Sequence, residues 1–355
     1  MKTIFIYTRY HKITLILFLF PFISIISFGC VFEEAQVSSD GEMAMYDVVT
    51  ITEEVNIDEG IIESIEEIGE EPIDISTDKL SDESIYNHAI YFAHGRNEMS
   101  WKLVDTPIIK HASVPDLLVL DQGVGEIPDG ALVSYFVDTS PLANGFDETI
   151  SYSYSLDKGT TWSERVEITV IGDVDVLPVD PSVVQLEDGR LRLYFFDFFH
   201  SRIPEQLGPS IFYSALSEDG IHFTIEDVAL ESDEPMTDPD VVYFQDEWFM
   251  YYARHDYAGG SVWLAKSTDG ITFINNVQIL DISGIPGAMV THDKVHIYGC
   301  DIGISYATSS NGIVFAQEGS VLYGNIQENP LICDPSPTPL KDGTFGLVVK
   351  QIFSE

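Results

Sequence analysis

Short apolar runs alternate with polar turns along most of the chain, from about residue 84 to the C-terminus. Runs of five or six residues rich in Val, Tyr and Phe recur at residues 132–137, 191–196, 248–253, 295–300 and 345–349. Runs of this length and composition, bounded by Gly, Asp and Asn, predict β-strands rather than helices. The pattern therefore predicts an all-β fold built from many short strands.

A segment with a central proline precedes each of these runs. Proline is tolerated at the first position of a strand, where its nitrogen need not donate a ladder hydrogen bond. Each x-Pro-x segment therefore indicates the start of a further strand, which a polar turn joins to the apolar run. The five segments are Val114-Pro115-Asp116, Asp180-Pro181-Ser182, Asp238-Pro239-Asp240, Ile285-Pro286-Gly287 and Asp334-Pro335-Ser336.

A second repeat consists of turns of the form Ser-x-Asp-Gly-x-x-aromatic, or remnants of it. They occupy residues 155–162, 217–223, 267–273 and 309–315, and a degenerate form occupies residues 95–101. Ser and Asp side chains bond local backbone groups and Gly supplies a positive φ, so these residues are expected to be structural. The turns resemble the Asp box of sialidases and other secreted propeller proteins, which lies on the face away from the active site. A period of tens of residues indicates a repeat architecture, here a β-propeller.

Five units fit between about residue 84 and the C-terminus. The last x-Pro-x segment is followed by enough chain for only two strands, whereas residues 89–93 and the degenerate turn come before any such segment. A propeller leaves no unpaired half blade only if these two pieces join. We therefore expect a five-bladed β-propeller over residues 85–355, with its last blade completed by N-terminal strands.

The first 84 residues have a different character. Lys2, Arg9 and Lys12 precede an apolar run at residues 13–28, which predicts a signal peptide over residues 1–29. Ser27-Phe28-Gly29-Cys30 resembles the lipobox of bacterial lipoproteins, which implies lipidation of Cys30 and a place in the cell envelope, facing the exterior or the periplasm. Plain secretion is the alternative. Residues 30–84 carry Asp and Glu throughout, and this density of like charge favours a disordered acidic tether.

The balance of charge excludes several partners. Lys and Arg number 17 against 58 Asp and Glu, a net charge of −41. This charge repels nucleic acid and anionic membrane surfaces, so contact with a membrane is expected only through the lipid anchor. No spacing matches a zinc site, a phosphate loop or a serine nucleophile elbow, and we expect no metal and no cofactor. The oligomeric state is left open, as is the choice between a Cys300–Cys333 disulfide and two buried thiols.

Propeller geometry sorts the polar residues by face. The first strand of each blade is innermost, so the carboxylates around its start converge on the axis, and residues that follow the second strand lie on the same face. Crowded carboxylates indicate a functional site, although a single Asp before a proline is also an ordinary turn residue. The axial carboxylates are Asp116, Asp180, Asp238, Asp240 and Asp334. The candidate rim or sugar-binding residues, which follow second strands, are Asp138, Asp197, Asp301, Phe199, His200, Arg254, His255 and Tyr257.

Five repeats, Asp-Pro segments and Asp-box-like turns together resemble the five-bladed propellers of glycoside hydrolase families 43, 32, 68 and 130. The resemblance implies that central carboxylates (Asp116, Asp180, Asp238 and Asp334) hydrolyse a glycosidic bond of a carbohydrate. For an inverting mechanism the base would be Asp180 or Asp116.

The acid of that mechanism is missing from its expected position. In family 32 a glutamate two residues before the proline supplies it, and no unit of this chain has a glutamate there. The competing hypothesis is therefore a non-catalytic propeller that binds glycan or protein at the cell surface. If the protein is an enzyme, a displaced glutamate is required, for which the candidates are Glu148, Glu205, Glu234 and Glu328.

Overall fold

The computed structural model describes two units of the chain, Met1–Ser76 and Thr77–Glu355. In the first unit, β1 (Thr3–Thr8) pairs with β2 (His11–Ile16), and β3 (Ser27–Cys30) pairs with β4 (Ile51–Glu54). Most of the predicted signal peptide and tether lies outside the described residues, so both stay predictions. No helix in the described part of the chain is long and apolar enough to cross a membrane. The described residues are 3–8, 11–16, 27–30, 51–54, 84–198, 209–256, 259–281, 284–301, 303–323 and 332–352.

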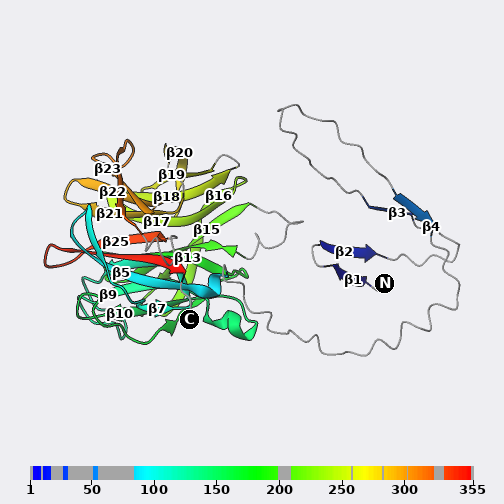
Figure 1. Ribbon diagram of the computed structural model, residues 1–355, viewed down its shortest axis with the longest axis horizontal. Helices are drawn as coiled ribbons and strands as arrows, with labels where there is room; N and C mark the ends of the chain where they lie inside the picture. The colour runs from blue at the N-terminus through cyan, green and yellow to red at the C-terminus, as the bar shows by residue number, and fades with distance from the viewer. Residues whose placement is uncertain are drawn as a thin grey trace. The chain divides into compact units, whose positions relative to one another are not determined.

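The second unit consists of five sheets, antiparallel apart from one edge strand, arranged as a β-propeller (Figure 1), as the repeats predict. In each sheet the strand with the x-Pro-x segment is innermost, and these five strands contact one another in a closed ring around the axis. Blade 1 contains β8 (Ala112–Val119), β9 (Leu132–Asp138), β10 (Thr149–Ser155) and β11 (Val166–Glu167). Blade 2 contains β13 (Pro178–Gln185), β14 (Leu191–Asp197), β15 (Ser210–Ser217), β16 (His222–Ser232) and the parallel edge strand β12 (Thr169–Ile171). Blade 3 contains β17 (Met236–Phe244), β18 (Glu247–Asp256), β19 (Gly259–Ser267) and β20 (Ile274–Leu280), and blade 4 contains β21 (Pro286–Thr291), β22 (Lys294–Asp301), β23 (Gly303–Ser309) and β24 (Ala316–Leu322).

Blade 5 joins the two ends of the propeller, which confirms the predicted closure. Its inner strands are β25 (Ile332–Pro339) and β26 (Phe345–Ile352), and its outer strands are β5 (His88–Asn97) and β6 (Ser100–Leu103). Eight residues of β26 pair with β5, and β7 (Ile109–Lys110) also pairs with β5. Two short 3-10 helices, η2 (Ile85–Asn87) and η3 (Ser140–Asn144), flank these elements.

Deleting residues 1–101 should therefore unfold or aggregate the propeller. The deletion removes all of β5 and leaves β26 as a buried strand with an unpaired edge. Circular dichroism and analytical centrifugation would measure the loss. Deleting only residues 31–71 should leave the melting temperature nearly unchanged, and a stable monomer that begins at Lys102 would contradict the closure.

The Ser-Asp-Gly turns fasten neighbouring blades at one end of the propeller. In blade 2, the hydroxyl of Ser217 accepts a hydrogen bond from the Gly220 N–H at 2.9 Å, and a carboxylate oxygen of Asp219 accepts from the Ile221 and His222 N–H groups. Four buried second-strand tyrosines donate to main-chain carbonyls of these turns in the next blade. The pairs are Tyr135 with Gly220 (3.0 Å), Tyr194 with Gly270 (2.5 Å), Tyr251 with Gly312 (2.9 Å) and Tyr298 with Glu98 (2.6 Å).

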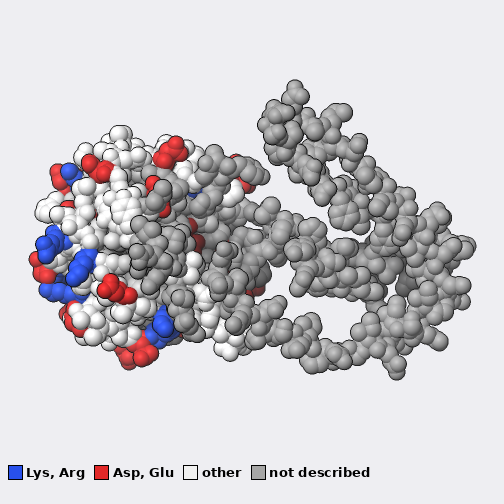
Figure 2. All heavy atoms as spheres, in the orientation of Figure 1, with Lys and Arg blue, Asp and Glu red and all other residues white. Residues whose placement is uncertain are grey.

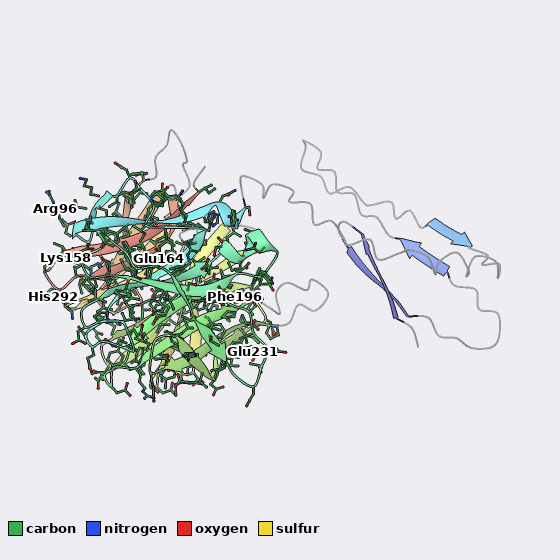
Figure 3. All side chains as sticks on the ribbon, turned by 90° about the horizontal axis from the view of Figure 1, so that it is seen from below. Arg96, Lys158, Glu164, Phe196, Glu231 and His292 are labelled. Atoms are coloured by element: carbon green, nitrogen blue, oxygen red, sulfur yellow. A yellow bond between two sulfur atoms is a disulfide. The ribbon has the colours of Figure 1, made fainter. Side chains whose placement is uncertain are left out.

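The two ends of the propeller therefore differ in content. Figure 3 shows Arg96 near the end of β5, and Lys158 and His292 from turns, at one end, with Phe196 and Glu231 toward the other. On the face drawn in Figure 2, lysine and arginine side chains gather mainly at the turn end. The second strands finish at the opposite end, near the x-Pro-x segments, which is the end that carries the axial carboxylates.

A ring of inter-blade bonds links the inner strands. At four of the five interfaces the side chain after the proline accepts a hydrogen bond from a main-chain N–H in the next blade, always two residues after that blade's proline. These bonds join Asp116 to Val183 (2.7 Å), Ser182 to Val241 (3.0 Å), Asp240 to Ala288 (2.7 Å) and Ser336 to Leu117 (2.8 Å). Two of the five predicted axial carboxylates, Asp116 and Asp240, thus have a partner in this ring.

Candidate functional site

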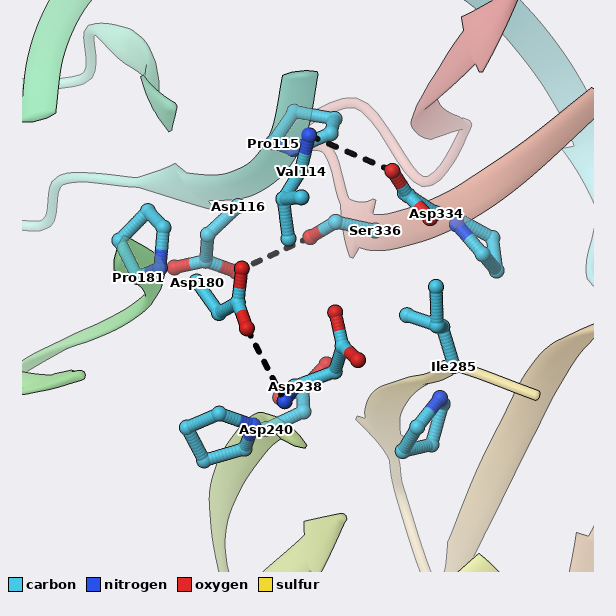
Figure 4. A pocket seen from close by; sticks show the side chains of 13 residues that line it. Val114, Pro115, Asp116, Asp180, Pro181, Asp238, Asp240, Ile285, Asp334 and Ser336 are labelled. Atoms are coloured by element: carbon cyan, nitrogen blue, oxygen red, sulfur yellow. Dashed lines mark hydrogen bonds between the residues drawn. The ribbon is translucent and has the colours of Figure 1, made fainter. Parts of the chain in front are cut away.

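All five x-Pro-x segments line one small pocket on the axis (Figure 4). The structure thus brings together the five carboxylates expected there. The space between them is about 20 Å³, enough for about one ordered water and too small for a sugar ring. A carbohydrate would therefore lie above the pocket, with at most a water at its floor. The carboxylates are Asp116, Asp180, Asp238, Asp240 and Asp334.

The backbone of these segments explains which side chains face the pocket. The residue before the proline has a positive φ in four blades: 41° at Val114, 51° at Asp180, 54° at Asp238 and 49° at Asp334. The strand register shifts at the same places, as in a β-bulge. Bulges of this kind re-aim side chains, and a positive φ at a residue other than glycine is strained. Neighbouring residues of one segment consequently have different tasks.

The carboxylates that follow a proline belong to the frame. Asp116 accepts hydrogen bonds from the Val183 N–H and from the Ser336 hydroxyl, the latter at 3.0 Å. Burial raises the pKa of Asp116 to about 6, against the opposing effect of these bonds. Burial also raises the pKa of Asp240 well above its ordinary value, with the charge of Asp116 adding to the effect. Both residues hold blades together, which gives Asp116 a structural task that the sequence analysis did not assign to it.

The carboxylates that precede a proline form the second group. The main-chain N–H of Asp238 donates to a carboxylate oxygen of Asp180 at 3.4 Å, and the Thr237 hydroxyl donates to Asp238 at 2.5 Å. Asp334 forms a salt bridge of 2.8 Å with the ammonium group of Lys350 and accepts a hydrogen bond from the Val114 N–H. Its other oxygen, Oδ1, is buried and has no hydrogen-bond partner among the described residues.

Burial raises the pKa values of two carboxyl groups in this second group. It raises the pKa of Asp238 to about 7, and the charge of Asp334 adds to the rise. Burial and the charges of Asp238 and Asp334 raise the pKa of Asp180 well above its ordinary range. Burial alone would lower the pKa of Lys350, but the charges of Asp334, Asp238 and Asp180 outweigh it, so that this pKa is raised. Near neutral pH the site therefore contains protonated carboxyl groups beside a buried ion pair.

Lys350 is the residue beside the axial carboxylates that sequence reasoning missed. It lies in β26, where it pairs with Cys333 of β25 and Ile90 of β5, and its side chain is only 12% exposed. A lysine directly after the apolar run of a second strand was the available signal, because a buried lysine requires a partner. His88 lies nearby, with its Nδ1 2.9 Å from the Ser113 hydroxyl, and burial and the Lys350 charge lower its pKa to about 4.

The candidate rim residues do not line the axial pocket where the structure describes them. Asp138 forms a salt bridge of 2.6 Å with Arg165 and accepts from the Ser151 hydroxyl. Asp197 accepts from the Leu177 N–H at 3.1 Å. The Arg254 guanidinium lies over the Trp263 ring, 4.0 Å from its centre. Phe199, His200, Tyr257 and the side chain of His255 lie outside the described residues, so their assignment stays a prediction.

The candidates for a displaced glutamate also lie away from the axial pocket wherever the structure describes them. Glu148 is buried and Glu234 exposed, and neither lines the axial pocket. Glu205 and Glu328 lie outside the described residues. Cys300 and Cys333, left open by the sequence, form a disulfide between blades 4 and 5, with their Cα atoms 5.0 Å apart.

Comparison with known proteins identifies the fold. No family model and no curated protein sequence matches the chain. Solved structures do match. The GH43_1 enzyme from Xanthomonas citri, complexed with xylotriose, is 14% identical with a TM-score of 0.51, over 69% of this chain and 88% of that one. The fold is a glycoside hydrolase-like five-bladed propeller.

Two further solved structures agree with this fold. The α-L-arabinanase from Penicillium chrysogenum, complexed with arabinobiose, is 13% identical with a TM-score of 0.50, over 74% of this chain and 86% of that one. A protein of unknown function from Dyadobacter fermentans is 11% identical with a TM-score of 0.50, over 74% and 84% of the two chains.

Proposed function

We propose that this propeller binds a carbohydrate over the axial pocket and hydrolyses one of its glycosidic bonds there. The observation that supports the proposal is the division among the axial carboxyl groups. Asp238, with a pKa raised to about 7, holds a proton that it can donate, whereas Asp334 is paired with a buried lysine. A carboxyl group that keeps its proton, beside a carboxylate held in an ion pair, is a combination that an inverting glycosidase can use. The fold shared with carbohydrate-bound enzymes agrees with this substrate class.

The proposed mechanism is inversion. Asp238 donates its proton to the glycosidic oxygen as the bond from this oxygen to the anomeric carbon breaks. A water held near Asp334 attacks the opposite face of the anomeric carbon and gives its proton to that carboxylate. The free space of about 20 Å³ between the carboxylates has room for this water.

This assignment differs from the one that the sequence suggests. Asp116 is occupied by inter-blade hydrogen bonds, and Asp180 has a strongly raised pKa, which suits a proton donor better than a base. Asp238 then serves as the general acid, the role for which the sequence analysis considered a displaced glutamate. Asp180 and Asp238 share the protonated side of the site, because burial raises both pKa values and the charge of Asp238 raises that of Asp180 further.

A screen against a panel of α- and β-linked pentose and hexose oligosaccharides tests the proposal. We expect release of reducing sugar from at least one member, with a product whose anomeric configuration, followed by proton NMR, is opposite to that of the substrate. Asp334→Asn should lower kcat by about 10²–10⁴-fold, whereas Glu234→Gln, an exposed control, should not. A retained configuration would contradict the inverting mechanism.

A second candidate function is glycan binding without catalysis. It is favoured by the absence of any glutamate from the axial pocket among the described residues. On this alternative, calorimetry would detect binding of a panel member that is not cleaved, and Asp334→Asn would weaken binding without any turnover to lose.

We further propose that the protein is a lipoprotein of the cell envelope, with secretion as the alternative. The lipobox-like sequence that ends at Cys30 supports this proposal. Cys30→Ser should release the protein from the membrane fraction or block its processing, because only a cysteine at the mature N-terminus is lipidated. Fully soluble wild-type protein with another residue first would contradict the anchor.

A further inference from the structure

The ring of inter-blade bonds is interrupted at one interface, between blades 4 and 5. The residue after the proline pairs with the second-strand tyrosine in blades 1 to 4, which makes these positions equivalent. In blade 4 this residue is Gly287, which has no side chain to accept a hydrogen bond. The expected donor in blade 5 is Pro337, which has no N–H. Both halves of the repeated bond are therefore missing from the same interface.

Close packing explains the glycine. A Cβ atom on Gly287 would lie 1.7 Å from the carbonyl oxygen of Pro335, so no other residue fits at this position without a shift of backbone. The two inner strands approach each other here through main-chain atoms. Close approach thus excludes the polar bond that the other four interfaces share.

The Cys300–Cys333 disulfide crosses this same interface. Cys300 is the last residue but one of the second strand of blade 4, two residues after Tyr298, and Cys333 lies two residues before Pro335 in blade 5. At the interface of blades 1 and 2 the equivalent positions are Val137 and Val179, which belong to one apolar cluster. The disulfide thus crosses the one interface between inner strands that lacks the hydrogen bond to the side chain after the proline.

The disulfide also contacts the candidate base directly. Cys333 is bonded to Asp334 through the chain, and the Asp334 N–H donates to the sulfur of Cys300 at 3.2 Å. Asp334 is held at a φ of 49°, which a residue other than glycine leaves unless its surroundings prevent it. Lys350, its salt-bridge partner, is the residue that pairs with Cys333 across the sheet.

We propose that the Cys300–Cys333 disulfide replaces the missing inter-blade bond and acts as a positioning device for the Asp334 carboxylate against Lys350. The positioning role in catalysis rests on the proposed function, but the geometric role does not. Without the disulfide, Asp334 relaxes away from its strained conformation and Lys350 loses its partner. The propeller itself remains closed, because β26 is still paired with β5 along eight residues.

Acylation of Lys350, followed by mass spectrometry, tests this geometry without requiring activity. In the Cys300→Ser/Cys333→Ser variant we expect Lys350 to be acylated at pH 8 at least 10-fold faster relative to the exposed Lys294. Its pKa falls when the Asp334 charge moves away, so more of the amine is unprotonated and reactive. Ser182→Ala, which removes the inter-blade bond to Val241 instead, is the matched control and should leave the Lys350 rate unchanged.

Reduced wild-type protein provides a second form of the experiment. A dithiol reagent supplies two electrons and two protons, the S–S bond becomes two thiols, and the reagent becomes a disulfide. We expect the same faster acylation of Lys350 while the circular dichroism spectrum persists. An unchanged rate in a folded, reduced protein would overturn the proposal. Unfolding of both disulfide-free forms would also overturn it, because the disulfide would then be a general brace of the fold.

Kinetics separate this inference from the proposed function. If the protein hydrolyses a glycan, the disulfide-free form should lose kcat by about 10-fold or more with little change in KM, because the base and not the sugar-binding surface is displaced. Faster acylation without any measurable hydrolysis in the wild type would leave the positioning role of the disulfide standing and count against hydrolysis alone.

Discussion

Lys350→Met is expected to cost about 3–5 kcal/mol of unfolding free energy, because it leaves a buried carboxylate without its partner. Lys350 is 12% exposed and Asp334 only 1%, so water cannot replace the lost ammonium group. The loss should be larger at pH 8 than at pH 5, since the neighbouring Asp238, with a pKa of about 7, adds its own negative charge as the pH rises. Urea unfolding at the two pH values would measure the difference.

Two further variants make this prediction specific. Lys294→Met, at the exposed first residue of β22, should change stability by less than about 0.5 kcal/mol. The double variant Lys350→Met/Asp334→Asn should recover part of the lost stability, because it removes the unpaired charge as well. If Lys350→Met is as stable as the wild type at pH 8, the salt bridge with Asp334 does not form in the folded protein.

Asp238→Asn is expected to abolish hydrolysis and yet stabilise the fold above neutral pH. The folded-state pKa of Asp238 is raised to about 7 from an ordinary value of 3.8, so its ionised form is disfavoured by folding. The penalty is absent below about pH 4, where the carboxyl is protonated in both states, grows between pH 4 and 7, and is complete above pH 7. At pH 8 the variant should gain about 1 kcal/mol or more, since each unit of pKa displacement corresponds to about 1.4 kcal/mol.

Loss of a carboxylate in the Ser-Asp-Gly turns should have the opposite effect, lowering stability while activity persists. Asp219→Ala removes the acceptor of two main-chain N–H groups and should cost about 1–2 kcal/mol while activity per folded molecule stays intact. Hydrogen bonds to these N–H groups and to His222 outweigh partial burial and lower the pKa of Asp219, so this contribution is lost below about pH 4. Asn is a poor probe here, because Asn311 makes the same contacts in the fourth turn.

Melting temperature and turnover, measured for Asp219→Ala and Asp238→Asn, show which end of the propeller is functional. Loss of turnover in Asp219→Ala together with normal turnover in Asp238→Asn would show that the functional end of the propeller is misassigned. Glu234→Gln, exposed and outside the lining of the axial pocket, serves as the control for each measurement.

The sequence was sufficient to predict the architecture because its repeats are local. Each x-Pro-x segment and each Ser-Asp-Gly turn is specified by a few consecutive residues, so their spacing predicts the number of blades. The closure followed from counting strands, since residues 89–93 had no other sheet to join. Pairing of β5 with β26 confirms this count.

The division of tasks among the axial carboxylates could not be predicted from the sequence. It depends on the positive φ at Asp180, Asp238 and Asp334, and a shift of one residue in a strand reverses the direction of every side chain. The salt bridge of Asp334 with Lys350 and the disulfide between blades depend on distances between residues far apart in the chain. Residue type alone made Asp116 and Asp180 look alike, whereas the structure gives them different partners. Asp116 accepts from the Val183 N–H and the Ser336 hydroxyl, and Asp180 accepts from the Asp238 N–H.

The most direct test of the central claim is a crystal structure of the Asp334→Asn variant with an oligosaccharide that the wild type cleaves or binds. The account predicts a sugar ring directly over the axial pocket, with the glycosidic oxygen about 2.6–3.2 Å from a carboxyl oxygen of Asp238 or Asp180. An oligosaccharide bound only at the end that carries the Ser-Asp-Gly turns, with the axial carboxylates untouched, would contradict it.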